Sequence, residues 1–346
     1  MNSAIPDGRP VAIDLFCGCG GMTVGLKRAG FRVAVGVDID TPALSSYQRN
    51  HPDVALVNAD IRSVSGRSIL ANARMKKGEL ALLAGCPPCQ GFSRMRRLNR
   101  ARASRDSRNS LLLEYVRLVD ELRPQMFLLE NVPGLAKYYQ FQDAVSTLAS
   151  LGYTTAVTIL DAADYGVPQH RKRLLLVGAK DFAPRIAGPS AKRRTVADAI
   201  RSLPPPGRSG DPIHDLRSKH SDLVRARIRS VPRNGGSRAT AKAFAALSCH
   251  RRNLGFKDVY GRLGWQRLAG TITSGCINPS KGRFLHPTQN RALSLREAAL
   301  LQGFPRKYSF DLAWGRGAVA CQIGNAIPPD LITRHARLLR LDHGNI

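Results

Sequence analysis

Apolar residues in the first 180 positions fall into seven short, nearly continuous runs. They are VAIDLFC (11–17), RVAVGVD (32–38), DVALV (53–57), LALLAG (80–85), QMFLLE (125–130), TTAVTIL (154–160) and RLLLVGA (173–179). Runs of this kind are typical of strands that are covered on both faces. Because amphipathic stretches separate them, the pattern predicts an α/β fold with a doubly wound, mostly parallel sheet.

Helical periodicity is clearest in three segments. The stretch 109–124 places Leu112, Tyr115, Val119 and Leu122 three or four positions apart, as on one face of a helix. The segments LSLREAALLQGFP (293–305) and PPDLITRHARLLRL (328–341) show start and stop signals of helices, namely proline before the second and glycine after the first.

The amino-acid composition and the periodicity change after residue 180. Stretches such as LPPPGRSGDP and VPRNGGSR are rich in proline, glycine, serine and arginine and lack regular periodicity. We therefore expect a catalytic body made of 1–180 and 291–346, with a smaller, irregular domain at 181–290.

Positive charge is concentrated in two places. The chain has 53 Lys and Arg against 25 Asp and Glu, a formal net charge of +28. Residues 181–290 hold 21 Lys and Arg against 6 Asp and Glu, a net charge of +15, and residues 94–108 hold seven Arg against one Asp, a net charge of +6. This distribution favours nucleic acid as the partner over a generally basic protein surface.

Seven scattered cysteines indicate a reducing compartment rather than a disulfide framework. Cys17 and Cys19 have the wrong spacing for zinc and no second Cys-x-x-Cys pair follows Cys86 and Cys89, so we expect no metal. Without a signal peptide or an apolar stretch of 18 residues, the sequence predicts a soluble, cytoplasmic protein away from membranes.

A glycine-rich turn follows the first predicted strand in DLFCGCGGMTVGLKRAG (14–30). Glycines there permit a sharp turn and let a ligand approach the backbone at the carboxyl end of the strand. Asp38 and Asp60 end the next two strands, where they would contact ribose and adenine. The pattern favours an adenosine-containing cofactor over an empty turn, but leaves a dinucleotide and S-adenosylmethionine both open.

Reactive groups follow three further strands. Cys89 comes after two stiff prolines in GCPPCQGFS, as a candidate nucleophile, although a redox pair with Cys86 and an inert core cysteine remain open. Glu130 ends a buried apolar run, where a protonated carboxyl group could act as an acid. Arg171 and Arg173 in QHRKR are predicted to point the same way as two fixed cations, unless they form a chance solvated run.

Together these groups describe a methyl transfer through a covalent adduct. Cys89 would add to carbon 6 of cytosine while Glu130 donates a proton to ring nitrogen 3, so that carbon 5 accepts a methyl group from a sulfonium cofactor. Loss of the carbon 5 proton then releases the enzyme. The base must leave the DNA stack, and the arginine-rich loop after Cys89 is expected to close over it.

The chain resembles the DNA (cytosine-5) methyltransferases of bacterial restriction-modification systems in DLFCGCGG, GCPPCQGFS, ENVPGL, QHRKR and GNAIPP, which occur in the family's order. The resemblance implies that Cys89 is the nucleophile, that Glu130 contacts the ring nitrogen, and that Arg173, supported by Arg171, contacts the flipped cytosine. It implies S-adenosylmethionine as cofactor, with double-stranded DNA read by the target recognition domain at 181–290. The pocket would be lined by Phe16, Gly18, Gly20, Gly21, Asp38, Ile39, Asp60, Ile61, Pro88, Leu111 and Asn325, and DNA contacts would come from Ser93, Arg94, Arg96 and Arg97.

Three other functions compete with this interpretation. A tRNA cytosine-5 methyltransferase of the same family would share the chemistry, but a separate basic domain favours duplex DNA. An NAD-dependent oxidoreductase would explain the glycine turn and Asp38 but not Cys89, and a DNA-binding module without activity would not need the catalytic set. We expect a monomer whose further partner is a restriction endonuclease acting on the same site.

Overall fold

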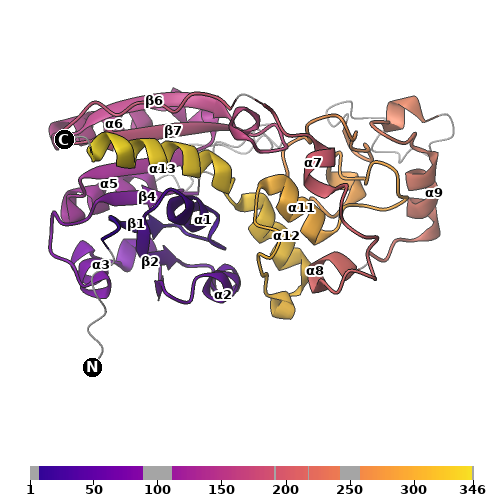
Figure 1. Ribbon diagram of the computed structural model, residues 1–346, viewed down its shortest axis with the longest axis horizontal. Coiled ribbons are helices and arrows are strands. Elements are labelled where there is room, and N and C mark those ends of the chain that lie inside the picture. The colour runs from indigo at the N-terminus through magenta and orange to yellow at the C-terminus, as the bar shows by residue number, and fades with distance from the viewer. Residues whose placement is uncertain (1–7, 89–110, 191, 217, 242–257, 345–346) are drawn as a thin grey trace. The chain divides into compact units, whose positions relative to one another are not determined.

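The computed structural model describes residues 8–88, 111–190, 192–216, 218–241 and 258–344 (Figure 1). The chain forms two compact units. The first contains Met1–Tyr165, Lys172–Pro189 and Ile327–Ile346, and the second contains Gly166–Arg171 and Ser190–Ala326. The division expected from the sequence placed 291–326 in the catalytic body, whereas the chain contacts group it with the second unit. The reason is that α11 (Leu295–Gln302) packs on α7 (Val196–Ile200) and α8 (Pro212–Asp215).

The first unit is built on a seven-stranded sheet with the order β3-β2-β1-β4-β5-β7-β6. Its strands are β1 (Val11–Leu15), β2 (Arg32–Asp38), β3 (Ala55–Asn58), β4 (Leu82–Gly85), β5 (Met126–Asn131), β6 (Thr154–Asp161) and β7 (Lys172–Ala179). The first five are parallel, while β7 is antiparallel to both β5 and β6. Each predicted apolar run overlaps one strand, so the predicted mostly parallel sheet is confirmed.

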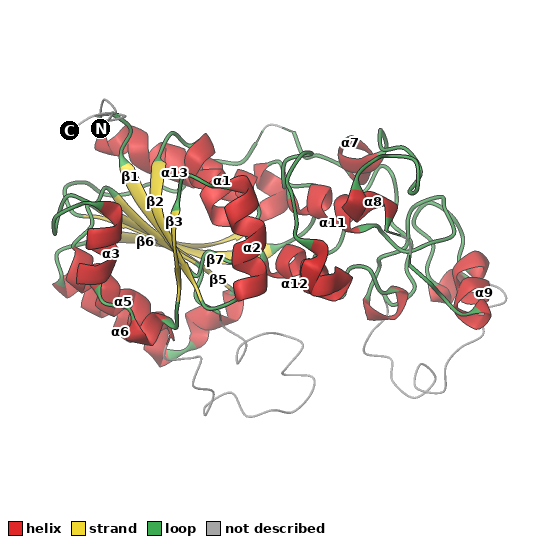
Figure 2. Cartoon of the chain, turned by 90° about the horizontal axis from the view of Figure 1, so that it is seen from below, coloured by secondary structure: helices red, strands yellow, loops and turns green. Residues whose placement is uncertain are grey.

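Helices cover both faces of this sheet (Figure 2). One face packs against α1 (Gly21–Arg28), α2 (Thr41–Asn50) and α13 (Pro329–His343). The other packs against α3 (Gly66–Ala73), α5 (Leu111–Leu122) and α6 (Tyr139–Ser150). Short 3-10 turns complete the unit at η1 (Ile61–Ser63), η5 (Pro133–Lys137) and η6 (Ala162–Tyr165). The helices expected from periodicity are confirmed as α5, α11 and α13.

A close crossing joins α1 to α13, the two most distant helices of the first unit in sequence. A Cβ built on Gly25 would lie 2.6 Å from Cβ of Ile332 and 2.8 Å from the carbonyl oxygen of Pro329. Only glycine lets the two backbones approach this closely. Gly25 thus fixes α1, and with it the glycine turn that precedes α1, against the C-terminal helix.

The second unit has little regular structure, as its sequence predicted. In the part that the structure describes, strand pairing is limited to isolated bridges. Its other elements are α9 (Asp222–Ser230), α12 (Gly315–Asn325), η7 (Arg238–Thr240), η8 (Pro279–Lys281) and η9 (Leu312–Trp314). One small apolar cluster contains Ile228, Val231, Val259, Tyr260 and Leu285. The rings of Phe304, Tyr308 and Phe310 form another buried group, and buried polar side chains form a network as well.

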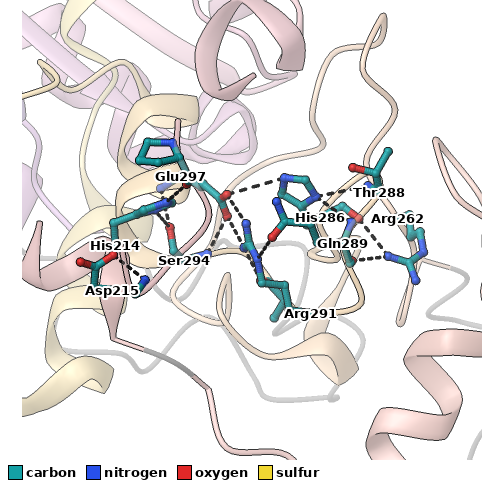
Figure 3. Close-up of polar contacts among 12 residues, drawn as sticks. His214, Asp215, Arg262, His286, Thr288, Gln289, Arg291, Ser294 and Glu297 are labelled. Atoms are coloured by element: carbon teal, nitrogen blue, oxygen red, sulfur yellow. Dashed lines mark hydrogen bonds and ion pairs between the residues drawn. The ribbon is translucent and has the colours of Figure 1, made fainter. Parts of the chain in front are cut away.

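That polar network is centred on Glu297, which is 1% exposed (Figure 3). Its carboxylate accepts from Arg291 Nη1 at 2.7 Å, from Arg291 Nη2 at 2.6 Å and from the Ser294 amide at 2.8 Å. Nearby, buried Arg262 donates to the carbonyl groups of Ile228 at 2.7 Å and His286 at 3.0 Å. Because their hydrogen bonds are satisfied, these charged groups help to order the unit alongside its apolar contacts.

Among the described residues, no helix is both long and apolar enough to span a bilayer. Nor do they contain a group of three or more His, Cys, Asp or Glu side chains arranged to hold a metal ion.

Candidate active site

The carboxyl ends of four parallel strands meet at one edge of the sheet. Leu15 of β1 pairs with Val37 of β2 and with Gly85 of β4, and Gly85 pairs in turn with Leu129 of β5. The residues that follow these positions therefore gather along the same edge. This is the edge at which doubly wound sheets bind their ligands.

The turn after β1 is braced by the carboxylate at the end of β2. Gly18, at φ 52°, donates its amide to Asp38 Oδ2 at 2.7 Å, and Asp40 donates its amide to Oδ1 at 2.8 Å. Burial raises the pKa of Asp38 above its ordinary value, against the lowering effect of these hydrogen bonds. The turn thus combines a backbone conformation that favours glycine with a partly buried acid.

The same turn fits an adenosine-type ligand in two respects. A Cβ built on Gly18 would meet nothing within 4 Å, so the backbone is open to close approach. Ile39, next to Asp38, is 65% exposed although it is large and apolar, as expected for a side chain that would pack against a flat base. Phe16 (φ 58°) and Gly20 (φ 94°) shape the turn, and Gly21 begins α1.

The other predicted cofactor residues have varied surroundings. The Asp60 carboxylate accepts from the Arg62 amide and from its Nη2 at 2.6 Å, and the side-chain bond from Arg62 lowers the pKa of Asp60. Ile61 is 4% exposed and belongs to the apolar core, and Leu111 packs partly against that core. The contact predicted between Asp60 and adenine therefore stays a prediction.

Asn58, which the sequence analysis did not single out, ties the strand ends together. Its Nδ2 donates to the carbonyl oxygens of Asp38 at 3.1 Å and Ile39 at 3.2 Å, and its Oδ1 accepts from Thr41 at 2.9 Å. A polar residue at the last position of an apolar strand was the available signal. Asn58 thus fixes the backbone of Asp38 and Ile39, two residues that the sequence predicts to bind the cofactor.

Asp14 is the last residue but one of β1 and is completely buried. Its Oδ2 accepts from Thr23 at 2.6 Å, and the Thr23 hydroxyl lies 2.6 Å from that of Tyr47. Burial raises the pKa of Asp14 to about 7, with a further contribution from the charge of Asp38. This chain of hydrogen bonds joins β1, α1 and α2 beneath the glycine turn.

Glu130 lies in β5 and is 2% exposed. Its Oε2 accepts from the thiol of Cys86, the first residue after β4. Its Oε1 lies 2.6 Å from Nε of Arg173 as an ion pair, yet makes no hydrogen bond to any described residue. The carboxyl group is thus held on one oxygen by a thiol, with a cation beside the other.

The backbone leading to the predicted nucleophile is fixed by the neighbouring strand. Asn131 Nδ2 donates to the carbonyl oxygen of Pro87 at 3.0 Å, one position beyond the Cys86 and Glu130 pair. Pro88 is exposed and is the last described residue of this segment. Cys89, Ser93, Arg94, Arg96 and Arg97 lie outside the described residues.

The two arginines of QHRKR have different partners. Arg173 in β7 lies against Glu130 in the first unit. Arg171, which is 3% exposed, donates to the carbonyl oxygens of Ile272 at 2.9 Å and Gly324 at 3.0 Å, both in the second unit. Asn325 is the exposed last residue of α12 in that second unit. The sequence predicted that the two arginines point the same way, but they have different partners, and the catalytic role of Arg171 stays a prediction.

Comparison with known proteins provides independent information on the family. The family model of the C-5 cytosine-specific DNA methylases matches residues 11–340. The Type II methylase M.HgiDII of Herpetosiphon aurantiacus is 38% identical over 91% of this chain and 91% of its own. The Type II methyltransferase M.XorII of Xanthomonas oryzae pv. oryzae is 33% identical over 93% of this chain and 82% of its own.

Solved structures agree with these matches. A protein described as a DNA modification methyltransferase encoded within an E. coli prophage superposes with a TM-score of 0.71 at 27% identity, over 97% of this chain and 100% of its own. The Dnmt2 methyltransferase of S. pombe superposes with a TM-score of 0.64 over 98% of this chain and 100% of its own. At 18% identity, the second likeness concerns the fold alone.

Proposed function

Because this chain belongs to the family of C-5 cytosine-specific DNA methylases, we propose that it methylates a flipped-out cytosine through a covalent adduct of Cys89. It is a DNA (cytosine-5) methyltransferase of the restriction-modification type. Beyond this assignment, the proposal covers the covalent adduct, the extruded base and the roles of individual residues. It also includes a specific double-stranded sequence as the target.

One observation carries the proposal, namely the surroundings of Glu130. A buried carboxyl group at the end of a strand needs partners, yet Oε1 makes no hydrogen bond to any described residue. Arg173 lies beside the same oxygen. A cytosine bound with its ring nitrogen 3 at Oε1 would give this oxygen a hydrogen bond. The adjacent carbonyl oxygen of the base would then lie near Arg173 as an acceptor.

Cys89 would supply the nucleophile. Its sulfur forms a bond to carbon 6 of cytosine while ring nitrogen 3 takes a proton from Glu130, which makes carbon 5 nucleophilic. After carbon 5 has received the methyl group, its proton passes to water, the electrons of that bond form the double bond between carbons 5 and 6, and the carbon–sulfur bond breaks to return the thiolate of Cys89. Ring nitrogen 3 then gives its proton back to Glu130. The fixed carbonyl group of Pro87 supports this role, because it sets the path of the backbone two residues before Cys89.

S-adenosylmethionine supplies the methyl group when bound. The residues proposed to hold it in the first unit are Phe16, Gly18, Gly20, Gly21, Asp38, Ile39, Asp60, Ile61, Pro88 and Leu111, while the predicted contribution of Asn325 stays a prediction from the sequence. The open backbone of Gly18 and the exposed Ile39 side chain support this assignment. Arg171 would act indirectly, by ordering the segment that leads to Arg173.

DNA contacts are proposed for Ser93, Arg94, Arg96 and Arg97, and for the target recognition domain at 181–290. A restriction endonuclease that cuts the same sequence is the proposed further partner. The net charges of +6 at 94–108 and +15 at 181–290 support both DNA-binding assignments.

Bisulfite sequencing of DNA from a host that expresses the protein tests this proposal. We expect 5-methylcytosine at one short sequence, and labelled methyl transfer in vitro to plasmid DNA rather than to total tRNA. Transfer to tRNA alone would establish the RNA substrate instead. Titration with a nicotinamide cofactor and with S-adenosylmethionine should show binding of the second only.

Substitutions separate the covalent mechanism from the general activity. Cys89→Ser should lower kcat at least about a hundredfold, because a hydroxyl is a far weaker nucleophile than a thiolate. Cys321→Ser changes an exposed cysteine on α12 and serves as the matched control. Unchanged methylation by Cys89→Ser would contradict the covalent adduct while leaving the family assignment intact.

A further inference from the structure

The two oxygens of the Glu130 carboxyl group have different neighbours. Oε2 accepts the hydrogen bond from Cys86 Sγ, whereas Oε1 has the Arg173 guanidinium beside it and no hydrogen bond to the described residues. A carboxyl group rotates broadly about its last torsion, so its two oxygens exchange easily unless a neighbour holds one of them. The thiol of Cys86 supplies that restraint.

Strand register brings Cys86 to this position. Gly85 of β4 pairs in parallel with Leu129 of β5, so the next residues along the two strands are Cys86 and Glu130. The amide of Cys86 also donates to the carbonyl oxygen of Leu15 at 3.3 Å, which ties its backbone to β1. Cys86 is half-buried and packs against the apolar cluster on that face of the sheet.

We propose that Cys86 is a positioning residue, whose thiol holds Oε2 of Glu130 and so directs Oε1 toward the base. This inference rests on the proposed function of Glu130, and it gives Cys86 a role separate from that of Cys89. It also offers an alternative to the redox-pair interpretation of Cys-x-x-Cys, because the Cys86 thiol donates to a carboxyl group.

Chemistry favours a thiol donor at this place. A carboxyl group that donates from Oε1 must accept at Oε2, and the S–H group provides a donor that carries no charge. A cation there would compete with Arg173 for the carboxylate. Loss of the thiol would leave Glu130 in place but let the carboxyl group turn.

Kinetics of two variants test the restraint. Cys86→Ala should lower kcat about tenfold with KM for DNA and for S-adenosylmethionine within twofold, because the base and cofactor still bind. Cys86→Ser should recover to within about threefold of the wild type, because its hydroxyl donates to the same oxygen. The control Cys276→Ala removes a buried thiol in the second unit and reports the cost of losing a core sulfur. Thermal unfolding of all variants shows which of them fold.

A second measurement does not depend on methylation. The hydrogen bond that Cys86 donates to Glu130 stabilises the thiol, whereas the thiolate is the form that reacts with maleimides. In the Cys89→Ser background, Glu130→Ala removes the acceptor and should therefore speed the alkylation of Cys86 several-fold, as measured by peptide mass spectrometry.

The outcomes are distinguishable. The inference would be overturned if replacing Glu130 left the alkylation rate of Cys86 unchanged. A folded Cys86→Ala enzyme with wild-type kcat would also overturn it. So would a folded serine variant that is as slow as alanine. If the wild type methylates no DNA, the proposed function fails, and the alkylation rate still decides whether Cys86 and Glu130 interact.

Discussion

Asp14 shows how one residue can oppose the stability of the sheet that it belongs to. It is completely buried, no cation pairs with it among the described residues, and its Oδ1 has no hydrogen-bond partner there. Thr23 and Tyr47 face it from α1 and α2, and the charge of Asp38 acts nearby. The neighbouring Cys17 thiol stays uncharged, because burial raises its pKa well above its ordinary value. A buried carboxyl group of this kind is more stable protonated.

Asp14→Asn should change how stability depends on pH. Below about pH 4 the group is protonated in both folded and unfolded states. Between pH 4 and 7 only the folded state keeps the proton, so the free energy of unfolding falls as pH rises, by up to about 4 kcal/mol, and levels off above pH 7. Asparagine does not titrate, so the variant lacks this pH-dependent contribution to the free energy of unfolding. Urea unfolding at pH 4.5 to 8 should therefore show a difference between wild type and variant that shrinks or reverses as pH rises; parallel curves would contradict it.

At the scale of an element, Glu297 is a buried carboxyl group that stays charged, in contrast to Asp14. It lies in the first turn of α11, where it forms a capping box with Ser294, and its carboxylate also accepts two bonds from Arg291. Burial opposes the charge, but the bonds from Arg291 outweigh it and hold the pKa of Glu297 below its ordinary value. Because α11 packs on α7 and α8, this carboxylate orders several elements of the second unit.

Glu297→Gln should destabilise the protein by about 3 kcal/mol, because it leaves a partly buried arginine without its countercharge. The matched control is Asp222→Asn, which removes a carboxylate from the exposed ion pair with Arg225 and should change stability little. Denaturant unfolding, followed by fluorescence of the tryptophans, measures both. Equal effects of the two substitutions would show that burial of the pair is unimportant.

At the scale of the whole molecule, the sequence predicted elements better than their pairing. Apolar runs located all seven strands, because burial on both faces leaves a local signal. The position of β7 between β5 and β6 has no such signal, since it depends on contacts between distant segments. The same limit applies to the site: Glu130 was predicted from its place at a strand end, whereas Cys86 as its partner needed the register of β4 on β5.

Charge distribution leads to the last prediction, which concerns DNA affinity. If the +28 protein contacts about six phosphates, its binding constant should fall roughly a thousandfold between 50 and 200 mM salt, because each neutralised phosphate releases a counterion. Replacing the three arginines within 94–97 with glutamine should flatten the log–log slope by up to about 3. Glutamine at Arg67, Arg74 and Lys77 removes equal charge outside the two basic segments. Fluorescence anisotropy on one duplex measures the binding constants of both variants. Equal log–log slopes for the two variants would show that the salt effect depends on net charge rather than on residues 94–97.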